Sequence, residues 1–216
     1  MAVMVALVTP SLCAASIASA DEAPVEPTAV HTESRLDGAR IRVGFAFEAG
    51  TWTEAAGFVE QPNPQIASTT SPYFGLQLEL GVQVDRHWGV YAVPSCGLAL
   101  GDFSGATGGI MCEIAVMADY TLLDGLLSIG AGPEIGQDLW IGTSGDDVDT
   151  YTLVGGRGRI ALHVLDSGSQ GGSRRRGFEV GLDAHLLDGI GGKGGLDQYG
   201  STFIFSPRLT VGYSAF

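Results

Sequence analysis

The sequence predicts an all-β protein, an eight-stranded antiparallel up-and-down transmembrane β-barrel. Three observations lead to this prediction. Apolar residues alternate with other residues in eight segments, the alternate face is rich in glycine and charge, and long and short connections alternate between the segments. These features are typical of strands that have one face against lipid and the other inside a closed barrel.

The alternation is clearest between Phe74 and Val84, where every second residue is Phe, Leu or Val. Residues on one face of a helix recur every 3.6 positions, whereas residues on one face of a strand recur every two. The segments have roughly 9–13 residues each, the length of a tilted strand that crosses a bilayer. The eight segments are residues 40–48, 74–84, 88–100, 110–120, 127–136, 154–164, 178–186 and 203–214.

A soluble barrel of the lipocalin type would show the same alternation, so the second face has to decide. A soluble surface normally carries mixed charge, including lysine. Here that face is rich in glycine, and Lys193 is the only lysine in the chain. Small residues with a few charges suit the narrow inside of an eight-stranded barrel.

The connections agree with this arrangement, because long loops at one end and short turns at the other are typical of membrane barrels. The segment 166–176 is the exception, a long connection at the short-turn end. Two aromatic girdles are expected at the two membrane interfaces. We expect long loops at 50–72, 101–109, 137–149 and 188–201, short turns at 85–87 and 121–125, one girdle of Trp52, Tyr73 and Tyr151, and the other of Trp88, Tyr120, Phe178 and Tyr213.

Composition excludes several other classes of protein. The 216 residues contain 24 Asp and Glu against 11 Lys and Arg, a net charge of −13, which argues against a nucleic-acid partner. With 45% hydrophobic residues the chain is not disordered as a whole. No apolar run beyond the N-terminus is long enough for a membrane-spanning helix.

The N-terminal region is expected to be a targeting segment. Residues 1–17 are apolar, and Ala18 and Ala20 fit a signal-peptidase site, so residues 1–20 are interpreted as a signal peptide cleaved near Ala20. Residues 21–38 contain prolines and carboxylates and predict a flexible periplasmic linker. The barrel then occupies residues 39–216.

The inward faces predict a network of charges in the lumen. Such charges are expensive unless they are paired, so we expect ion pairs. Pairing about the sixth turn places Arg159 opposite Asp183 and His163 opposite Glu179. The predicted network consists of Arg40, Arg42, Glu79, Glu113, Glu134, Arg157, Arg159, Glu179, Asp183 and Arg208, with Glu48, Asp119, His163 and His185 on the same faces. Either it plugs the barrel, or it lines a narrow passive channel for small solutes or ions.

Two cysteines remain after the signal peptide. Cys96 and Cys112 lie at mirror positions about the connection 101–109, so they are candidate cross-strand neighbours on the lipid side. The periplasm is oxidising enough for a disulfide, while a pair of free thiols is the alternative.

The expected loops are acidic, with Glu54 and Asp138 among their carboxylates. Asp146, Asp147 and Asp149 form a weak candidate for a Ca²⁺ site, although their spacing does not fit an EF-hand and a solvated loop is the simpler interpretation. We expect no bound metal and no cofactor.

An enzymatic role has little support in the sequence, which contains no G-x-S-x-G, HExxH, P-loop or C-x-x-C motif. Some small barrels modify lipid A with a Ser, a His and a carboxylate near the outer rim. His185, with Asp188 and Ser201 or Ser206, is the one candidate set. We expect no enzyme, with a lipid A-modifying barrel as the alternative.

On this pattern, and on a terminal strand that ends in Phe216, the chain resembles the small outer-membrane β-barrels of Gram-negative bacteria, the OmpA and OmpX type. The resemblance covers residues 39–216. It implies a monomer in the outer membrane, in contact with lipid and lipopolysaccharide, that the barrel-insertion machinery recognises through the strand ending in Phe216. The implied role is structural or one of surface interaction.

Overall fold

The computed structural model describes residues 39–58, 66–103, 106–142, 148–165, 176–193 and 199–215. The signal-peptide and linker predictions, and Phe216, lie outside these residues. The described part consists of eight strands and a single short 3-10 helix, η1 (Leu123–Gly125). The strands are β1 (Arg40–Phe58), β2 (Ile66–Gln83), β3 (Trp88–Phe103), β4 (Ala106–Leu122), β5 (Leu127–Gly142), β6 (Val148–Leu165), β7 (Arg176–Lys193) and β8 (Tyr199–Ala215). No helix in this part is long and apolar enough to cross a bilayer.

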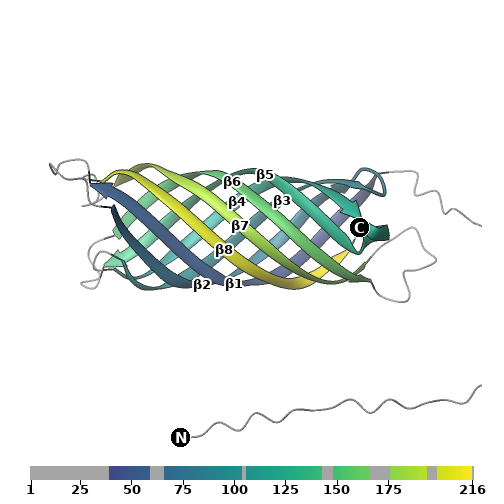
Figure 1. Cartoon of the computed structure of the whole chain (residues 1–216), viewed down its shortest axis with the longest axis horizontal. Coiled ribbons are helices and arrows are strands. Elements are labelled where there is room, and N and C mark those ends of the chain that lie inside the picture. Colours follow the sequence, from purple (N-terminus) through teal and green to yellow (C-terminus); the bar gives the residue numbers. More distant parts are fainter. Residues whose placement is uncertain are drawn as a thin grey trace, which may run out of the picture. The chain divides into compact units, whose positions relative to one another are not determined.

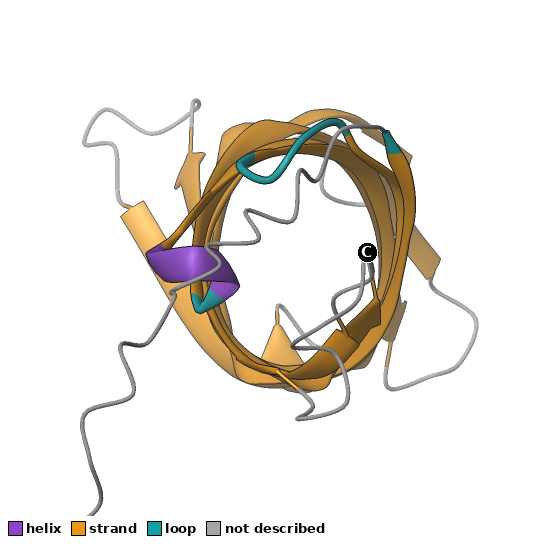
Figure 2. Ribbon diagram, turned by 90° about the vertical axis from the view of Figure 1, so that its right-hand side faces the viewer, coloured by secondary structure: helices purple, strands orange, loops and turns teal. Residues whose placement is uncertain are grey.

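The strands form one closed antiparallel barrel in sequence order, with β8 paired to β1 (Figure 1). Seen along its axis, the barrel is a ring of strands (Figure 2). The predicted all-β, eight-stranded up-and-down fold is therefore confirmed. Closure leaves no free strand edge, since each strand has a hydrogen-bonded neighbour on both sides.

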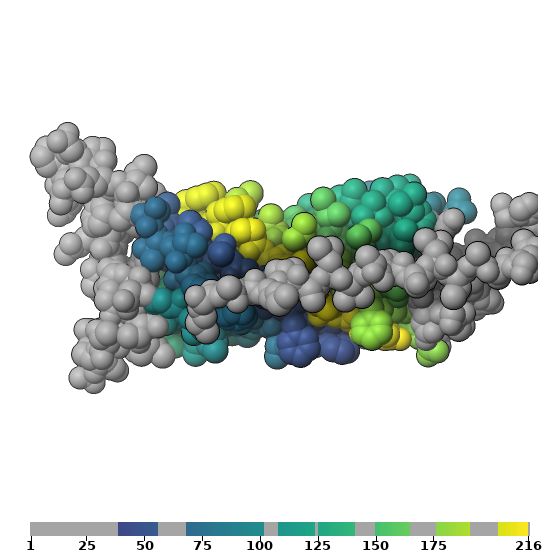
Figure 3. All heavy atoms as spheres, turned by 60° about the horizontal axis from the view of Figure 1, so that its bottom comes forward, coloured from purple at the N-terminus to yellow at the C-terminus, as the bar shows by residue number. Residues whose placement is uncertain are grey.

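Alternate residues of each strand point outwards and inwards, as the period of two predicts. On β2, Leu78 is 51% exposed whereas the adjacent Glu79 is 2% exposed. Phe47, Leu182 and Val211 behave like Leu78 on their own strands. These outward side chains belong to the lateral surface of the barrel, part of which is seen in Figure 3.

The strands are longer than the apolar alternation predicts. The expected loop 50–72 is mostly strand, because the ladder between β1 and β2 continues beyond Gly50, which is opposite Tyr73, up to Gly57 opposite Ile66. The outward face changes there from apolar residues to threonine, and the Thr53 and Thr70 hydroxyls lie 3.0 Å apart. Threonine favours strands without marking a lipid-facing surface, so hydrophobicity alone ended the predicted segments too early.

The two short turns are confirmed at one end of the barrel. Between β2 and β3, the Asp85 carboxylate accepts hydrogen bonds from the backbone N–H groups of His87 (2.6 Å) and Trp88 (2.8 Å). Between β4 and β5, η1 reverses the chain, with Leu123 and Gly125 at positive φ. The polypeptide enters and leaves the barrel at this same end, because the strand number is even.

Candidate functional site

The inside of the barrel holds the candidate site, and the predicted lumen charges lie there almost without contact with solvent. Arg40 is the exception, because it lies partly exposed at the start of β1. The buried set, each member at most 4% exposed, comprises Arg42, Glu48, Glu79, Glu113, Asp119, Glu134, Arg157, Arg159, His163, Glu179, Asp183, His185 and Arg208.

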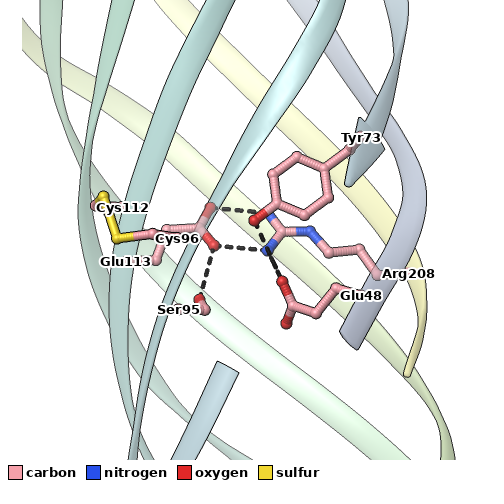
Figure 4. The surroundings of a disulfide bond; sticks show 7 residues. All are labelled: Glu48, Tyr73, Ser95, Cys96, Cys112, Glu113 and Arg208. Atoms are coloured by element: carbon pink, nitrogen blue, oxygen red, sulfur yellow. Dashed lines mark hydrogen bonds and ion pairs between the residues drawn. A yellow bond between two sulfur atoms is a disulfide. The ribbon is translucent and has the colours of Figure 1, made fainter. Parts of the chain in front are cut away.

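One ion pair joins strands β4 and β8, which are four positions apart in a ring of eight and so lie on opposite walls. The Arg208 guanidinium donates through Nη1 to Glu113 Oε2 (2.8 Å) and through Nη2 to Glu113 Oε1 (2.9 Å). Arg208 also donates to Glu48 at 3.1 Å, and its guanidinium lies 3.8 Å from the ring centroid of Tyr73 (Figure 4). A cation held in this way spans the lumen.

A second crossing joins β6 to β2, again on opposite walls. Arg159 on β6 forms an ion pair with Glu79 on β2, and it also pairs with Glu179 on the neighbouring β7. Two residues along β6, Arg157 donates to Gln77 on β2 and pairs with Asp183 on β7. Side chains from opposite walls therefore meet in the middle of the barrel at two successive inward positions of β6.

A fourth arginine closes the lumen nearer to the end with the termini. Arg42 on β1 forms ion pairs with Glu79 (3.1 Å) and with Asp119 on β4 (2.5 Å). Its guanidinium also lies 3.9 Å from the centroid of the Tyr91 ring, a cation–π contact. Arg42 and Arg159 share Glu79, so the pairs form one connected network.

The two lumen histidines also have acidic neighbours. The predicted register about the sixth connection is confirmed, with Arg159 opposite Asp183 and His163 opposite Glu179. His163 Nδ1 lies 3.3 Å from Glu179, and its Nε2 lies 2.9 Å from the Ser128 hydroxyl. His185 Nδ1 lies 3.0 Å from both carboxylate oxygens of Glu134.

The sequence prediction placed Glu54 and Asp138 in acidic loops, and this was wrong. Both carboxylates face the lumen, at 2% and 1% exposure, because β1 and β5 extend beyond the apolar segments. Asp138 accepts hydrogen bonds from the Tyr151 backbone N–H (2.9 Å) and the Trp140 indole (3.3 Å). The sequence could have indicated this, because Glu54 is an even number of residues from inward-facing Glu48 and so lies on the same face of the strand.

One of the two predicted aromatic girdles was also wrong. Trp52, Tyr73 and Tyr151 do not face lipid but lie inside the barrel, at 1%, 0% and 8% exposure. They form an apolar cluster at the end opposite the termini, together with Ala99, Met111, Trp140, Leu153, Leu187 and Ile204. The polar lumen is therefore covered at this end by packed apolar side chains, which the prediction of a polar, largely plugged lumen did not include.

The girdle at the other end lies on the outside as predicted. Trp88 and Phe178 are 50% and 66% exposed. Trp88 packs edge-on against Tyr120 with ring centroids 5.0 Å apart, and Phe178 packs in the same way against Tyr213 at 5.7 Å. Amphipathic rings in this position suit the level of the lipid headgroups.

His185 has the only neighbours among the described residues that could hold a metal ion. It belongs to two triads, one with Glu113 and Glu134 and the other with Glu48 and Asp183, and the ligand atoms of each triad lie within 4.8 Å of one another. Glu113, however, already accepts both hydrogen bonds from Arg208. The weak Ca²⁺ candidates Asp146 and Asp147 lie outside the described residues, and the side chain of Asp149 is not described.

The alternative catalytic set does not assemble. Ser206 lies opposite His185 in the β7–β8 register, but its hydroxyl accepts a hydrogen bond from Arg208 Nε at 2.9 Å. Asp188 has the opposite parity on β7 and is exposed on the outer face. The side chain of Ser201 is not described. Asp188 therefore lies on the other face of β7 from His185 and cannot orient the imidazole ring.

Cys96 and Cys112 are direct cross-strand partners on β3 and β4 and form a disulfide, with Cα atoms 4.2 Å apart. Both residues are on the outer face. Glu113, next in sequence to Cys112, points the other way into the lumen (Figure 4). The bond therefore closes the β3–β4 hairpin from outside the barrel.

Taken together, the surface and the interior are reversed relative to a water-soluble protein. Large apolar side chains are about half exposed all around the barrel, whereas buried arginines and carboxylates fill its centre. Only a hydrocarbon solvent outside the strands stabilises that distribution. The chain is a small outer-membrane β-barrel by fold.

Comparison with solved structures gives barrels of the same kind at low sequence identity. Neisserial surface protein A is 12% identical with a TM-score of 0.47, over 82% of this chain and 98% of that one. Ail, the attachment invasion locus protein of Yersinia pestis, is 11% identical with a TM-score of 0.36, over 79% and 97%. The outer membrane protease OmpT of Escherichia coli is 7% identical with a TM-score of 0.35, over 84% and 97%. No family model and no curated protein matches the barrel.

Proposed function

We propose that the protein is an integral outer-membrane barrel with a sealed lumen, and that its role is structural or one of surface interaction rather than transport. The observation that carries this proposal is the pair of crossings between opposite walls, Arg208 to Glu113 and Arg159 to Glu79. Side chains that meet across the diameter obstruct the passage of a solute.

Two further features support a sealed lumen. The apolar cluster that contains Trp52 and Trp140 covers the end of the barrel opposite the termini. Near the other end, Arg42 holds Glu79 and Asp119 from different walls and stacks on Tyr91. A hydrated ion would have to displace the apolar cluster at one end and the Arg42 contacts near the other, in addition to the ion pairs between them.

Conductance of the refolded protein in a planar lipid bilayer tests the proposal. Heat-modifiable mobility on gels is the mark of a folded barrel and identifies the preparation to be used. In that preparation we expect no single-channel conductance steps at moderate voltage. Regular conductance steps from the same preparation would contradict a sealed lumen. If the detergent-solubilised protein showed no heat-modifiable form, the assignment as a membrane barrel would be contradicted.

A narrow channel is the second candidate, and one observation favours it. Several buried polar atoms have no hydrogen-bond partner within the protein, among them Arg157 Nη1, Gln77 Nε2 and Thr210 Oγ1. Buried polar atoms of this kind are usually satisfied by water. A chain of such waters would pass protons or small ions, and proton flux into barrel-containing vesicles, measured with a pH-sensitive dye, distinguishes it from a dry plug.

We also propose how the protein reaches the outer membrane and what it contacts there. Residues 1–20 are removed near Ala20, the linker 21–38 remains in the periplasm, and the barrel-insertion machinery recognises the strand that ends in Phe216. The monomer contacts lipid and lipopolysaccharide through its apolar face, and we propose no nucleic-acid partner. N-terminal sequencing of the mature protein from outer membranes tests the cleavage, since a first residue other than Asp21 contradicts it.

A further inference from the structure

We propose that the disulfide between Cys96 and Cys112 is closed before the barrel enters the membrane, by a soluble periplasmic dithiol–disulfide oxidoreductase. The inference rests on the outer-membrane location proposed above. It concerns the modification of this chain during its assembly and names the class of reaction that supplies the disulfide. The position of the two sulfurs carries it.

The disulfide lies on the lipid side of the barrel. The outer face of β4 continues on either side of Cys112 with Ile110 and Ile114, which are 40% and 44% exposed. On β3, Cys96 is followed on the same face by Leu98 at 50% exposure, and the residue opposite it on β2 is Leu76 at 56%. Hydrocarbon chains contact such a surface, so the bond is covered by lipid in the inserted protein.

The bond is also far from the periplasmic rim. Trp88 and Tyr120 are direct partners on the same hairpin and mark the rim at the end with the termini. Cys96 is eight residues further along β3, which at about 3.3 Å per residue and a tilt of about 40° is roughly 20 Å along the barrel axis. The apolar band of such barrels is about 25 Å tall, so the bond lies in the half of the band away from the periplasm.

The exchange chemistry needs access that this position denies. The thiolate of one cysteine attacks the disulfide of the oxidoreductase and releases one enzyme thiolate. The second cysteine then attacks the mixed disulfide and releases the other, so the protein loses two electrons and two protons and the enzyme becomes a dithiol. Both attacks require a charged sulfur, which hydrocarbon disfavours, and contact with a soluble protein that cannot enter the bilayer.

Early closure has a structural consequence for the hairpin. Cys96 and Cys112 are opposite each other in the native register. A shift by one residue would turn the apolar residues of a strand into the lumen and its lumen residues out into lipid. A bond made before insertion therefore delivers β3 and β4 to the membrane in the register that they keep.

The test compares the reduced chain in two states. One sample is unfolded in urea, and the other is folded into phosphatidylcholine nanodiscs, which leave both ends of the barrel open to solvent. Each is mixed with a soluble bacterial dithiol–disulfide oxidoreductase in its disulfide form, and the remaining thiols are counted by the gel shift from a maleimide-linked polymer. We expect oxidation of the inserted barrel to be more than about tenfold slower than that of the unfolded chain.

A matched variant controls for folding in the nanodisc. The variant with Cys96→Ser, Cys112→Ser, Trp88→Cys and Tyr120→Cys moves the pair along the same hairpin, between the same two strands, to the periplasmic rim. We expect the enzyme to oxidise this pair in the inserted barrel, while the native pair in the same lipid stays reduced. Equal rates for the native pair in the unfolded and inserted chains would overturn the proposal.

Two other outcomes also support or overturn the proposal. A chain that inserts only when it is oxidised supports the proposal, because the bond must then precede insertion. A chain that shows no heat-modifiable form in either redox state overturns the membrane location, and this inference with it. The gel mobility and the thiol count are separate measurements, so the two failures are distinguishable.

Discussion

Arg208 on β8 and Glu113 on β4 connect opposite walls of the barrel through two parallel hydrogen bonds of 2.8 and 2.9 Å. The two strands are not neighbours in the sheet, so no backbone hydrogen bonds connect them and the side chains alone make this contact. Bidentate pairs of this type combine charge with fixed geometry. The contact therefore fixes the spacing of two walls that the sheet leaves four strands apart.

Glu113→Gln is expected to destabilise the barrel strongly, because it leaves the buried Arg208 guanidinium with less compensating charge. Removal of one partner from a buried pair typically costs about 3–5 kcal/mol, and the contact of Arg208 with Glu48 at 3.1 Å places the expected loss near the lower limit. The measurement is the urea midpoint of the lipid-reconstituted protein, followed by tryptophan fluorescence.

The control for this prediction removes both charges. Glu113→Gln combined with Arg208→Met is expected to be more stable than Glu113→Gln alone, since no buried cation is then left uncompensated. If the single variant unfolded at the wild-type urea concentration, the crossing would contribute little. If the double variant were the less stable of the two, the guanidinium would act through packing against Tyr73 instead.

Gly155→Ala is expected to destabilise β6 by roughly 1–3 kcal/mol, the usual cost of overpacking. A Cβ at Gly155 would lie 1.9 Å from the Leu186 carbonyl oxygen on β7, and backbone cannot move aside as a flexible side chain can. The matched control is Gly158→Ala on the same strand, where a Cβ meets nothing within 4 Å. Thermal unfolding in detergent compares the two, and equal melting temperatures would contradict the prediction.

Most of the fold could be predicted from sequence because one physical signal, the period of two, is repeated in all eight strands. Leu78 and Glu79 already indicate which faces contact lipid and lumen. The strand ends could not be predicted in the same way. Beyond the bilayer the outward residues, such as Thr51 and Thr53, no longer need to be apolar, while the hydrogen-bonded ladder continues.

The lumen was predictable in its membership but not in its partners. Parity assigns Arg159 and Glu79 to the inside, yet nothing in the spacing indicates that β2 and β6 face each other until the ring is closed in order. The inward aromatic residues were misassigned for a different reason. Trp52 near a strand end suits a membrane interface, and only its parity with Glu48 indicates the interior.

Replacement of both cysteines by serine is expected to lower the stability of the barrel by about 3 kcal/mol, the loop-closure value for a loop of this size. The cross-link joins residues separated by 16 positions, and it acts mainly by restricting the unfolded chain. Urea unfolding of the variant and of the oxidised wild type gives the difference. Wild-type protein kept in reductant should match the variant, and a reduced wild type as stable as the oxidised form would contradict the assignment.

The turn between β2 and β3 is expected to give the barrel an acid-dependent contribution to stability. The backbone N–H groups of Trp88 and His87 donate to the Asp85 carboxylate and hold its pKa below the ordinary value of 3.8. A carboxylate whose pKa is lower in the folded state stabilises that state above the unfolded pKa. The contribution is lost as the pH falls through the folded pKa.

Asp85→Ala should therefore be less stable than the wild type at pH 7, by less than about 1 kcal/mol because the group is exposed to solvent. The difference should shrink below a pH of about 4, as the wild-type carboxyl group takes up its proton. Asp85→Asn is the informative control, since its side-chain oxygen still accepts hydrogen bonds but does not titrate. Its stability relative to Asp85→Ala should stay constant with pH, and an acid-dependent difference between these two variants would show that another group is responsible.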